Sequence, residues 1–388
     1  MNAGNLSARS DSETVRPLGV APSFSLAFVS SLRRWGGGEK WMLAAAGAMR
    51  DRGHRVTLIV QPGSELAARA EVAGLDLVAV RLGGWLDPRT LAELALALRR
   101  ARVQVIVANL DKEIRQSRLA AGLAGRAVKL VARRGSPVPI KDSWHYRLVY
   151  RHWVDRLICN AQAIVEPVCG PAPWFDRSRV RVIPNGVDVT ALQRRARETD
   201  LRRELEIAPD RLVIACVGEV GWRKGQEHVL AAAVALRDRF AHAVWLIAGE
   251  GEGLDELRDR AAALGLLEGG YLRFLGFRPD APAVLAASDL LVLPSRSEGF
   301  PNTLLEGMAL GLPVCASRAD GIPELVLEGE TGLLHGVDDV ATFTGQVERL
   351  LEDGELRRRL GTAGARRARE VFALERVMDR VEECLVVW

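Results

Sequence analysis

Two glutamates eight residues apart, Glu298 and Glu306, have the spacing that most clearly predicts chemistry in this sequence. They lie on either side of a predicted helix start that follows the apolar run Leu290–Leu293, which we interpret as a buried strand. Pro301 suits the first position of a helix, where a missing N–H has no cost, and the free amides that follow attract anions. Glu306 lies four residues after Asn302 and therefore about 6 Å further along the same helix face. We expect phosphates at the helix start and a ribose that donates hydrogen bonds to Glu306.

Glu298 precedes the helix and lies on the other side of the expected phosphates, where a transferred group would sit. A carboxylate beside a phosphate is unfavourable, because like charges repel. A neutral, polyhydroxylated partner such as a sugar removes this difficulty. The alternative interpretation of the same residues is an ordinary strand–helix unit that carries two surface glutamates.

The residues around the two glutamates resemble a known signature. The segments are Glu298-Gly-Phe-Pro-Asn302 with Glu306, Gly311-Leu-Pro-Val314, Gly321-Ile-Pro-Glu324 and Gly329-Glu-Thr-Gly-Leu333. Together they resemble the paired-glutamate pattern of the retaining family 4 glycosyltransferases. The resemblance implies a GT-B fold, an α/β architecture of two Rossmann-like, doubly wound domains that face an interdomain cleft, with a C-terminal helix crossing back to the first domain. The donor-binding residues it implies here are Glu298, Gly299, Phe300, Pro301, Asn302, Thr303 and Glu306.

The composition indicates a soluble globular protein. A chain of 388 residues exceeds a single core and predicts two domains, and 48% hydrophobic with 26% charged residues is ordinary for such a protein. No apolar run approaches the ~20 residues of a membrane helix, and the polar residues 1–22 lack a signal core. We expect 1–22 to be a disordered tail. Five scattered cysteines without metal-ligand spacing favour a reducing cytoplasm.

The two halves of the chain differ in charge. Residues 1–181 contain 28 Lys and Arg against 15 Asp and Glu, whereas the remainder contains 25 against 34. This asymmetry predicts an anionic partner for the first half, although solvated arginines would give the same count. Arg99, Arg100 and Arg102 end an amphipathic helix that we expect to contact the anionic inner face of the membrane.

Between residues 23 and 185, strand-like segments alternate with helical patterns, which predicts a doubly wound parallel sheet. The predicted strands are Ser25–Ser31, Val56–Val60, Leu77–Val80, Val103–Ala108, Val128–Ala132 and Arg156–Cys159. Ligands of such sheets bind at the carboxyl ends of the strands. The first strand is followed by Gly36, Gly37 and Gly38, which resemble the family's glycine loop facing the donor phosphates and sugar. Alone, a glycine triplet is equally consistent with a tight turn.

Polar groups also follow two later strands of this first domain, where we expect the acceptor to bind. The acceptor candidates are Asn109, Asp111, Lys112, Arg134, Lys141 and His145. Ordinary loop charge is the alternative, and His145 is also placed to pack near Trp144.

Val182-Ile-Pro-Asn-Gly-Val-Asp188 resembles the family's crossing into the second domain, which we expect at residues 186–370 and which binds the nucleotide sugar. A charged helix, Leu192–Leu205, comes early in this domain. Residues 371–388 are expected to form the helix that packs back on the first domain. The predicted strands of the second domain are Leu212–Val217, Ala243–Ala248, Tyr271–Gly276, Leu290–Leu293, Pro313–Ala316 and Gly332–His335.

The loop after the first of these strands holds Glu219, Arg223 and Lys224, and two cations at this place suit a diphosphate clamp. Lys224 matches the family's lysine. Glu219, however, stands where the family usually has arginine, and we hypothesise that Arg223 substitutes from the far side of the loop. Arg278 lies where related enzymes contact the nucleobase.

The resemblance implies metal-independent transfer without a cofactor, and no Asp-x-Asp cation site is visible. Charge on the leaving diphosphate is then met by Lys224, Arg223 and helix amides, so Glu298, Lys224 and Arg223 are the catalytic candidates. Retention is expected through front-face attack, with a covalent glycosyl-enzyme as the alternative.

The expected partners are a nucleotide-sugar donor and a glycan or lipid-linked acceptor of the cell envelope, such as a lipopolysaccharide core, and not a nucleic acid. Two alternatives remain. A dinucleotide oxidoreductase needs Gly-x-Gly-x-x-Gly after the first strand, which the glycine triplet does not supply. A catalytically weak GT-B protein that binds nucleotide sugars or glycans is kept open by Glu219.

Overall fold

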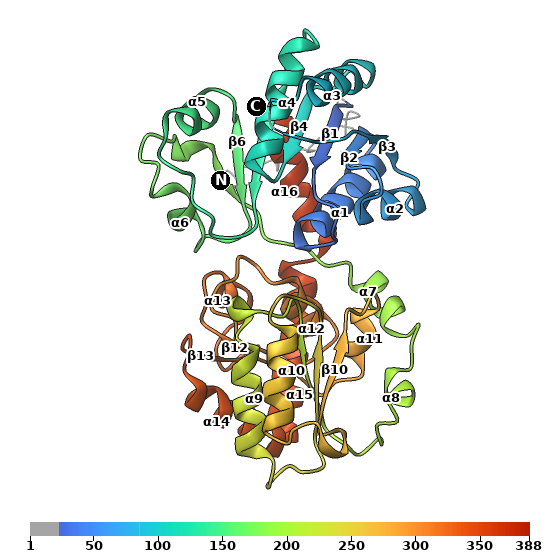
Figure 1. Cartoon of the computed structure of the whole chain (residues 1–388), viewed down its shortest axis with the longest axis vertical. Coiled ribbons are helices and arrows are strands. Elements are labelled where there is room, and N and C mark those ends of the chain that lie inside the picture. Colours follow the sequence, from blue (N-terminus) through green and yellow to red (C-terminus); the bar gives the residue numbers. More distant parts are fainter. Residues whose placement is uncertain (1–22, 85) are drawn as a thin grey trace, which may run out of the picture.

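Two separate parallel sheets organise the chain and lie one above the other in Figure 1. The computed structural model describes residues 23–84 and 86–388, so the predicted tail 1–22 lies outside the described residues. The first sheet has the strand order β3-β2-β1-β4-β5-β6-β7, and the second has β10-β9-β8-β11-β12-β13. The prediction of two Rossmann-like, doubly wound domains is confirmed. The division of the chain at residues 185 and 370 is kept as a proposal.

The first sheet is buried on both faces by helices. Its strands are β1 Ser25–Ser30, β2 Arg55–Val60, β3 Asp76–Ala79, β4 Val105–Ala108, β5 Lys129–Arg134, β6 Arg156–Cys159 and β7 Val180–Val182. Its helices are α1 Gly37–Asp51, α2 Glu65–Val72, α3 Pro88–Arg100, α4 Asp111–Leu123, α5 Trp144–His152 and α6 Val165–Cys169. Every residue of β1 is buried, as expected for the central strand of a parallel sheet.

Three details of this sheet differ from the prediction, and one is that β4 begins at Val105 and not at Val103. β7 was missed, because three residues with an exposed arginine in the middle do not form an apolar run. β7 nevertheless pairs in parallel with β6 and forms the sheet edge. β5 also extends two residues beyond the predicted strand, so that Arg133 and Arg134 are buried strand residues and not loop residues.

The second sheet contains all six predicted strands. They are β8 Val213–Val217, β9 Val244–Ala248, β10 Leu272–Gly276, β11 Leu290–Leu293, β12 Val314–Ser317 and β13 Leu333–His335. The helices around it are α7 Val189–Ala196, α8 Leu201–Glu204, α9 Gln226–Leu236, α10 Leu254–Ala263, α11 Ala281–Ala286, α12 Asn302–Ala309, α13 Ile322–Leu325, α14 Val340–Glu352 and α15 Gly354–Val371. The predicted single helix Leu192–Leu205 was wrong. It is two helices, because Asp200 caps a new one by accepting from the amide of Arg203 at 3.2 Å.

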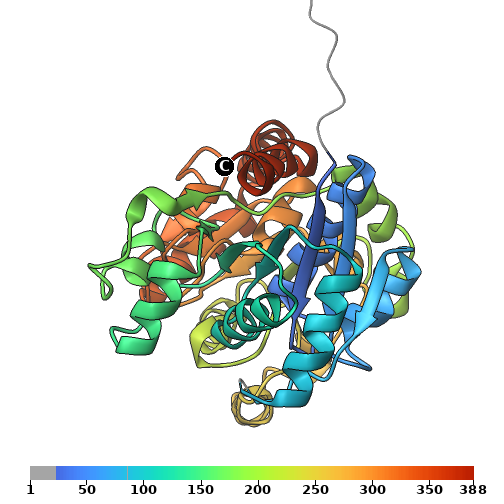
Figure 2. The ribbon, with the colours of Figure 1, turned by 90° about the horizontal axis from the view of Figure 1, so that it is seen from above.

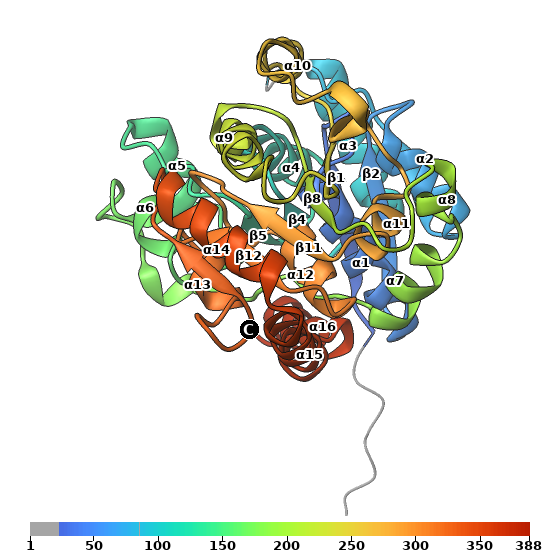
Figure 3. The ribbon, with the colours of Figure 1, turned by 90° about the horizontal axis from the view of Figure 1, so that it is seen from below.

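The last helix, α16 Leu374–Val386, returns to the first domain (Figure 1). Its apolar face packs in one core with α1 and the strands of the first sheet, through Val377, Met378, Val381, Cys384 and Leu385. Viewed along the long axis, α16 lies at one edge of the molecule (Figures 2 and 3), and in Figure 1 it lies above α15. The predicted crossing of the C-terminal helix is therefore confirmed.

The outgoing and returning segments are hydrogen-bonded to each other. The amide of Val187 donates to the carbonyl oxygen of Phe372 at 2.9 Å, and the amide of Leu374 donates to that of Val187 at 3.0 Å. Val187 and Ala373 thus form a short parallel bridge. The two covalent connections between the domains form one hydrogen-bonded unit.

Each sheet reverses its strand order at one place, between β1 and β4 in the first sheet and between β8 and β11 in the second. In open α/β sheets, ligands bind in the crevice at such switch points, outside the carboxyl ends of the strands. The glycine triplet follows β1 and Asn109 follows β4, whereas Lys224 follows β8 and Glu298 follows β11. The fold therefore collects the predicted site residues at two switch points.

Leu385→Ala should destabilise the first domain by about 3 kcal/mol, because it leaves a cavity in the core that α16 shares with α1. Denaturant unfolding measures the change. Val387→Ala is the control, since that side chain is exposed and its loss should be within the error of the measurement. An equally small effect for Leu385→Ala would mean that α16 does not stabilise the first domain.

Candidate active site

The two domains touch along a seam formed by the loops at the carboxyl ends of β5 and β6 in the first domain and of β11 and β12 in the second. A Cβ on Gly299 would lie 2.1 Å from the carbonyl oxygen of Gly135, so only glycine allows this backbone approach. The carboxylate of Glu324 accepts from the amides of Gln162 at 2.8 Å and Ala163 at 2.7 Å. The Gly-Ile-Pro-Glu motif therefore links the domains.

The amino ends of α1 and α12, which belong to different domains, lie close together. Asn185, in the crossing segment, is bonded to the start of α12: its Nδ2 donates to the carbonyl oxygen of Phe300 at 2.8 Å and to Oδ1 of Asn302 at 2.9 Å. A Cβ on Gly37 would lie 3.4 Å from Nδ2 of Asn302. Two helix amino ends of this kind favour an anion between them. We had predicted Pro301 to be the first residue of this helix. It is instead the residue before α12.

Glu298 is buried and is surrounded by groups that stabilise its charge. Lys224 Nζ contacts Oε1, which also accepts from the hydroxyl of Ser295 at 2.9 Å. Arg223 Nη1 lies 3.8 Å from Oε2. The amide of Glu298 donates to Asp320 at 2.8 Å, which fixes the loop. A buried carboxylate with two cations is electrostatically compensated, and these contacts hold it in place.

Lys224 reaches Glu298 because the loop after β8 packs against the loop after β11. Gly225 has a φ of 66°, and a Cβ there would lie 2.2 Å from the carbonyl oxygen of Pro294. A side chain at this position would separate the two loops.

Arg223 contacts residues of its own loop and of the loop after β11. Its Nη2 lies 3.3 Å from Oε2 of Glu219, and its Nη1 donates to the carbonyl oxygen of Ser297 at 2.9 Å. Glu219 is exposed and thus pairs with the residue that we proposed as its substitute. The role of Arg223 toward a diphosphate stays a prediction.

Glu306 also forms an ion pair. Lys40, on α1 of the first domain, contacts Oε1 of Glu306 across the seam. Burial lowers the pKa of Lys40 to about 8, and the charge of Arg195 acts in the same direction. The carboxylate that we predicted to bind a ribose is therefore already paired with a cation. Sequence reasoning missed Lys40, whose one signal was its place in the first turn after the glycine triplet.

Arg133 and Asn185 were missed as well. Arg133 is buried, its Nη2 donates to Oδ1 of Asn185 at 2.9 Å, and its guanidinium lies 4.4 Å from the centre of the Trp41 ring. Burial lowers the pKa of Arg133 to about 10, and the nearby Glu39 opposes this. The sequence placed Asn185 only in the crossing segment, yet it links Arg133 to the start of α12.

Two of the acceptor candidates, Asp111 and Arg134, lie in one buried cluster. The carboxylate of Asp111 contacts the guanidinium of Arg134 and the hydroxyl of Tyr150, and it accepts from the hydroxyl of Tyr146 at 3.0 Å. Burial acts to raise the pKa of Asp111, but Arg134 and the tyrosine hydroxyls outweigh it and hold this pKa below the usual value. The α5 helix, which carries both tyrosines, is thereby fixed to the amino end of α4.

The other candidates have different surroundings. Asn109 Nδ2 lies 3.0 Å from the position of a Cβ on Gly38, and Lys112 Nζ donates to the carbonyl oxygen of Leu82 at 2.7 Å. Lys141 is exposed, and His145 packs between Trp144 and Tyr146, with ring centres 5.5 and 5.1 Å away. No single site is formed by all of the acceptor candidates.

Arg278 is held by two carboxylates, Glu204 at 2.6 Å and Asp280 at 2.7 Å. Hydrogen bonds to these two groups raise the pKa of its guanidinium. The guanidinium of Arg278 is thus paired with a carboxylate of α8, and a contact with a nucleobase stays a prediction. Thr303, the second residue of α12, remains a donor candidate through its amide.

Both domains match known family models, and each match includes one of the two switch points. Residues 35–191 match Glycosyltransferase Family 4, and residues 197–367 match Glycosyl transferases group 1. The chain belongs to the family 4 glycosyltransferases. It is therefore a glycosyltransferase of the GT-B type, and the dinucleotide oxidoreductase alternative is wrong.

The chain is similar over most of its length to the lipopolysaccharide core biosynthesis glycosyltransferase LpsE of Rhizobium meliloti (strain 1021). Identity is 28% over 350 residues, which cover 89% of this chain and 94% of LpsE. It is also 28% identical to the UDP-Gal:alpha-D-GlcNAc-diphosphoundecaprenol alpha-1,3-galactosyltransferase of Escherichia coli, over 69% of this chain and 71% of that protein. The crystal structure of Anabaena Alr3699/HepE in complex with UDP and glucose superposes with a TM-score of 0.82 at 20% identity, covering 94% of this chain and 100% of that one. This last likeness establishes the fold alone.

Asp111→Asn should lower the free energy of unfolding at pH 7 by about 3 kcal/mol, because it leaves the buried Arg134 without its counter-charge. The depressed pKa of Asp111 means that its contribution is present above the ordinary pKa of about 3.9 and is lost as the pH falls through the folded-state value. Wild type should therefore lose stability more steeply than the variant below about pH 4. Denaturant unfolding at several pH values measures this.

Asp142→Asn is the matched control. Asp142 also pairs with an arginine, Arg147, but at an exposed site, so the substitution should leave the unfolding curve nearly unchanged. Parallel acid limbs for wild type and Asp111→Asn would contradict the assignment.

Proposed function

We propose that this glycosyltransferase is a retaining enzyme that transfers a sugar from a nucleotide-sugar donor to a glycan or lipid-linked acceptor of the cell envelope. The observation that carries the proposal is the convergence of Lys224 and Arg223 on the buried Glu298, beside the amino end of α12. Two cations, a fixed carboxylate and free helix amides are the groups that a diphosphate-linked sugar requires.

In the donor complex, the diphosphate lies between the amino ends of α1 and α12, near the amides of Gly37, Asn302 and Thr303. Lys224 and Arg223 supply the positive charge that the leaving diphosphate needs, and for this reason we propose metal-independent transfer. Glu306 accepts hydrogen bonds from the ribose hydroxyls. Lys40 either leaves the carboxylate of Glu306 when the ribose binds or shares this carboxylate with the ribose. Glu298 then orients the hydroxyls of the transferred sugar.

We propose front-face transfer. The bond between the anomeric carbon and the phosphate oxygen breaks, and an acceptor hydroxyl forms the new bond on the same face. The proton of that hydroxyl passes to the departing phosphate oxygen. Lys224 stabilises the charge as it develops, while contact of the domains along the seam excludes water that would hydrolyse the donor.

The acceptor is proposed to bind on the first-domain side, near Asn109 and the cluster of Asp111 and Arg134. The similar proteins support this acceptor class by their names: LpsE belongs to lipopolysaccharide core biosynthesis, and the galactosyltransferase acts on a diphosphoundecaprenol-linked sugar. We further propose a cytoplasmic enzyme that contacts the inner membrane face. Within residues 23–84 and 86–388, no helix is long and apolar enough to cross a bilayer.

A catalytically weak binding subunit is the second candidate. One observation favours it: Glu219, which replaces the family's usual arginine, pairs with Arg223. If this pair holds Arg223 away from the diphosphate, Lys224 alone is left of the two cations proposed for the clamp.

Exchanging each glutamate of the pair for glutamine should separate their roles. Glu306→Gln should weaken binding of the matching nucleoside diphosphate about tenfold, because the ribose loses a charged acceptor. Glu298→Gln should leave that affinity nearly unchanged but lower turnover at least about tenfold, because Glu298 contacts only the transferred sugar. Calorimetric titration with UDP, GDP and ADP, together with donor hydrolysis rates, measures both. Equal losses of diphosphate affinity in the two variants would place Glu298 at the phosphates and overturn the proposal.

Substitutions of Arg223 and Glu219 test the diphosphate clamp. If Arg223 serves the leaving group, Arg223→Ala should lower turnover about 100-fold, and Glu219→Arg should change it little. Glu256→Arg, an exposed charge reversal on α10, controls for the altered net charge. A slow wild type that Glu219→Arg accelerates would instead favour the binding subunit.

A further inference from the structure

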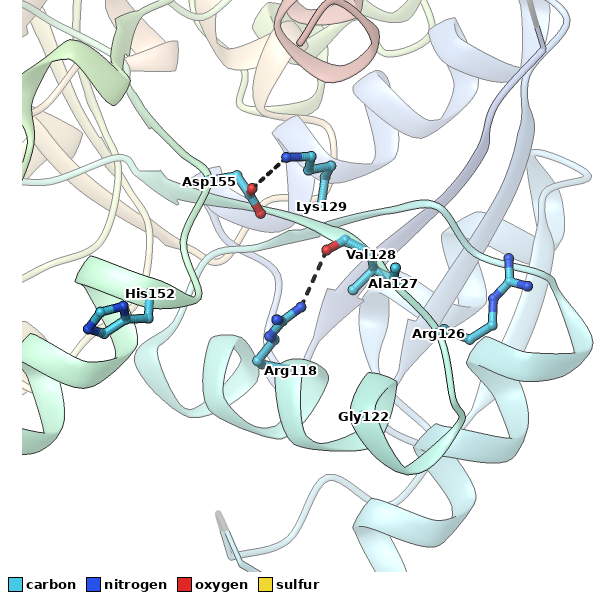
Figure 4. A pocket seen from close by; sticks show the side chains of 8 residues that line it. All are labelled: Arg118, Gly122, Arg126, Ala127, Val128, Lys129, His152 and Asp155. Carbon is cyan, nitrogen blue, oxygen red and sulfur yellow. Dashed lines mark hydrogen bonds and ion pairs between the residues drawn. The ribbon is translucent and has the colours of Figure 1, made fainter.

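A basic hollow lies at the amino-terminal edge of the first sheet, opposite the seam. Its larger part, about 510 Å³, is lined by five cations: Lys129, Arg151, Arg156, Arg179 and Arg181. An adjoining part of about 410 Å³ shares Lys129 and His152 and adds Arg118 and Arg126 (Figure 4). Asp155 is the one acidic side chain among the lining residues of both parts. The hollow therefore carries a strong excess of positive charge.

Most of these cations are held by neutral groups. Arg156 donates to the carbonyl oxygen of Cys384 at 2.6 Å and stacks on Trp388 at 4.4 Å. Arg181 donates to the carbonyl oxygens of Ser178 at 2.7 Å and Val180 at 2.9 Å, whereas Arg179 also pairs with Asp176 at 3.4 Å. A carbonyl fixes a guanidinium without cancelling its charge, so the positive potential remains available to an anion outside the molecule.

Helix α5 leads from this hollow to the seam. Because β5 and β6 are parallel neighbours, the helix between them runs from the carboxyl edge of the sheet to the amino edge. α5 lies on the outer flank of the first domain (Figures 1 and 3). Its Trp144 end follows the loop at the seam, and its Arg151 end lines the hollow.

The outward face of α5 combines apolar and cationic side chains, and since Arg147 is paired with Asp142, the net charge of this face comes from Arg151. Trp144, Arg147, Leu148 and Arg151 follow the spacing i, i+3, i+4, i+7 and are all exposed, with Trp144 at 77% and Leu148 at 42%. The opposite face is buried and holds the tyrosines that contact Asp111. One helix thus carries an amphipathic outer surface and fixes the proposed acceptor side from within.

We propose that the outward face of α5, together with the basic hollow, docks on an anionic phospholipid membrane. The cations match lipid phosphates, and an exposed tryptophan with a neighbouring leucine suits the headgroup region of a bilayer. A soluble polyanion needs only the charges and leaves these apolar groups in water. The proposal rests on the lipid-linked acceptor proposed above and assigns the surface that brings the acceptor side to the membrane.

The chain provides a matched control. Leu148 and Arg151 are exposed and three residues apart on α5, and Leu96 and Arg99 are exposed and three residues apart on α3. The α3 pair belongs to the helix end that the sequence had suggested as the membrane contact. The double variants Leu148→Ser/Arg151→Ser and Leu96→Ser/Arg99→Ser remove the same groups from the two surfaces, and neither pair touches the proposed donor site.

The experiment measures co-sedimentation of the full chain with vesicles of phosphatidylcholine alone or with about one-third phosphatidylglycerol. Wild type should bind the anionic vesicles and lose binding between about 0.1 and 0.5 M salt. The α5 variant should bind about tenfold more weakly, with circular dichroism and nucleoside diphosphate affinity unchanged, and the α3 variant should differ less than about twofold. Equal binding to neutral vesicles, a larger loss in the α3 variant, or no binding by wild type would overturn the proposal.

A single-stranded 20-nucleotide DNA serves as the soluble polyanion. Tighter binding to this DNA than to the vesicles would also overturn membrane docking. Vesicle binding needs neither donor nor acceptor, so its failure is separate from failure of the proposed transfer. An enzyme that transfers sugar but ignores vesicles would contradict only the docking surface, and one that binds vesicles without transferring sugar would contradict only the proposed function.

Discussion

Direct backbone contact between the two domains is the constraint on which the rest of the site depends. Gly299 and Gly135 approach more closely than any side chain allows. That contact sets the distance between the loops that follow β5 and β11, and with it the separation of the amino ends of α1 and α12. Asn185 and Glu324 then fix the orientation, because each bonds groups of the opposite domain. The pairing of Lys40 with Glu306 across the seam depends on this approach of two glycines.

The seam also concentrates carboxylates that are costly to bury alone. Glu298 is compensated by Lys224 and Arg223 from its own domain, whereas Glu306 is compensated by Lys40 from the other domain. The two glutamates therefore differ in what holds them. Displacing Lys224 disturbs one domain, but displacing Lys40 removes an interaction between domains. Binding at Glu306 is thus physically linked to the fit of the domains, and binding at Glu298 is not.

Much of the fold could be predicted from the sequence because buried parallel strands are continuous apolar runs. All six strands of the second sheet lie within one residue of the predicted ends, and α16 lies within the predicted 371–388. β7 was missed because it is a short edge strand whose middle residue is exposed. Within the site, residue types next to strand ends were visible in the sequence. The pairing of Lys40 with Glu306, however, depends on two segments 266 positions apart, and no local pattern carries that information.

The return of α16 has a consequence for how the protein is made. The apolar face of this helix belongs to the core that β1 and α1 begin, near the other end of the described chain. A ribosome therefore completes the whole second domain before it supplies the last piece of the first. During that interval Met42 and its neighbours on α1 have no α16 to cover them, so the domain translated first is the one completed last. The order of synthesis and the order of completion are reversed in this molecule.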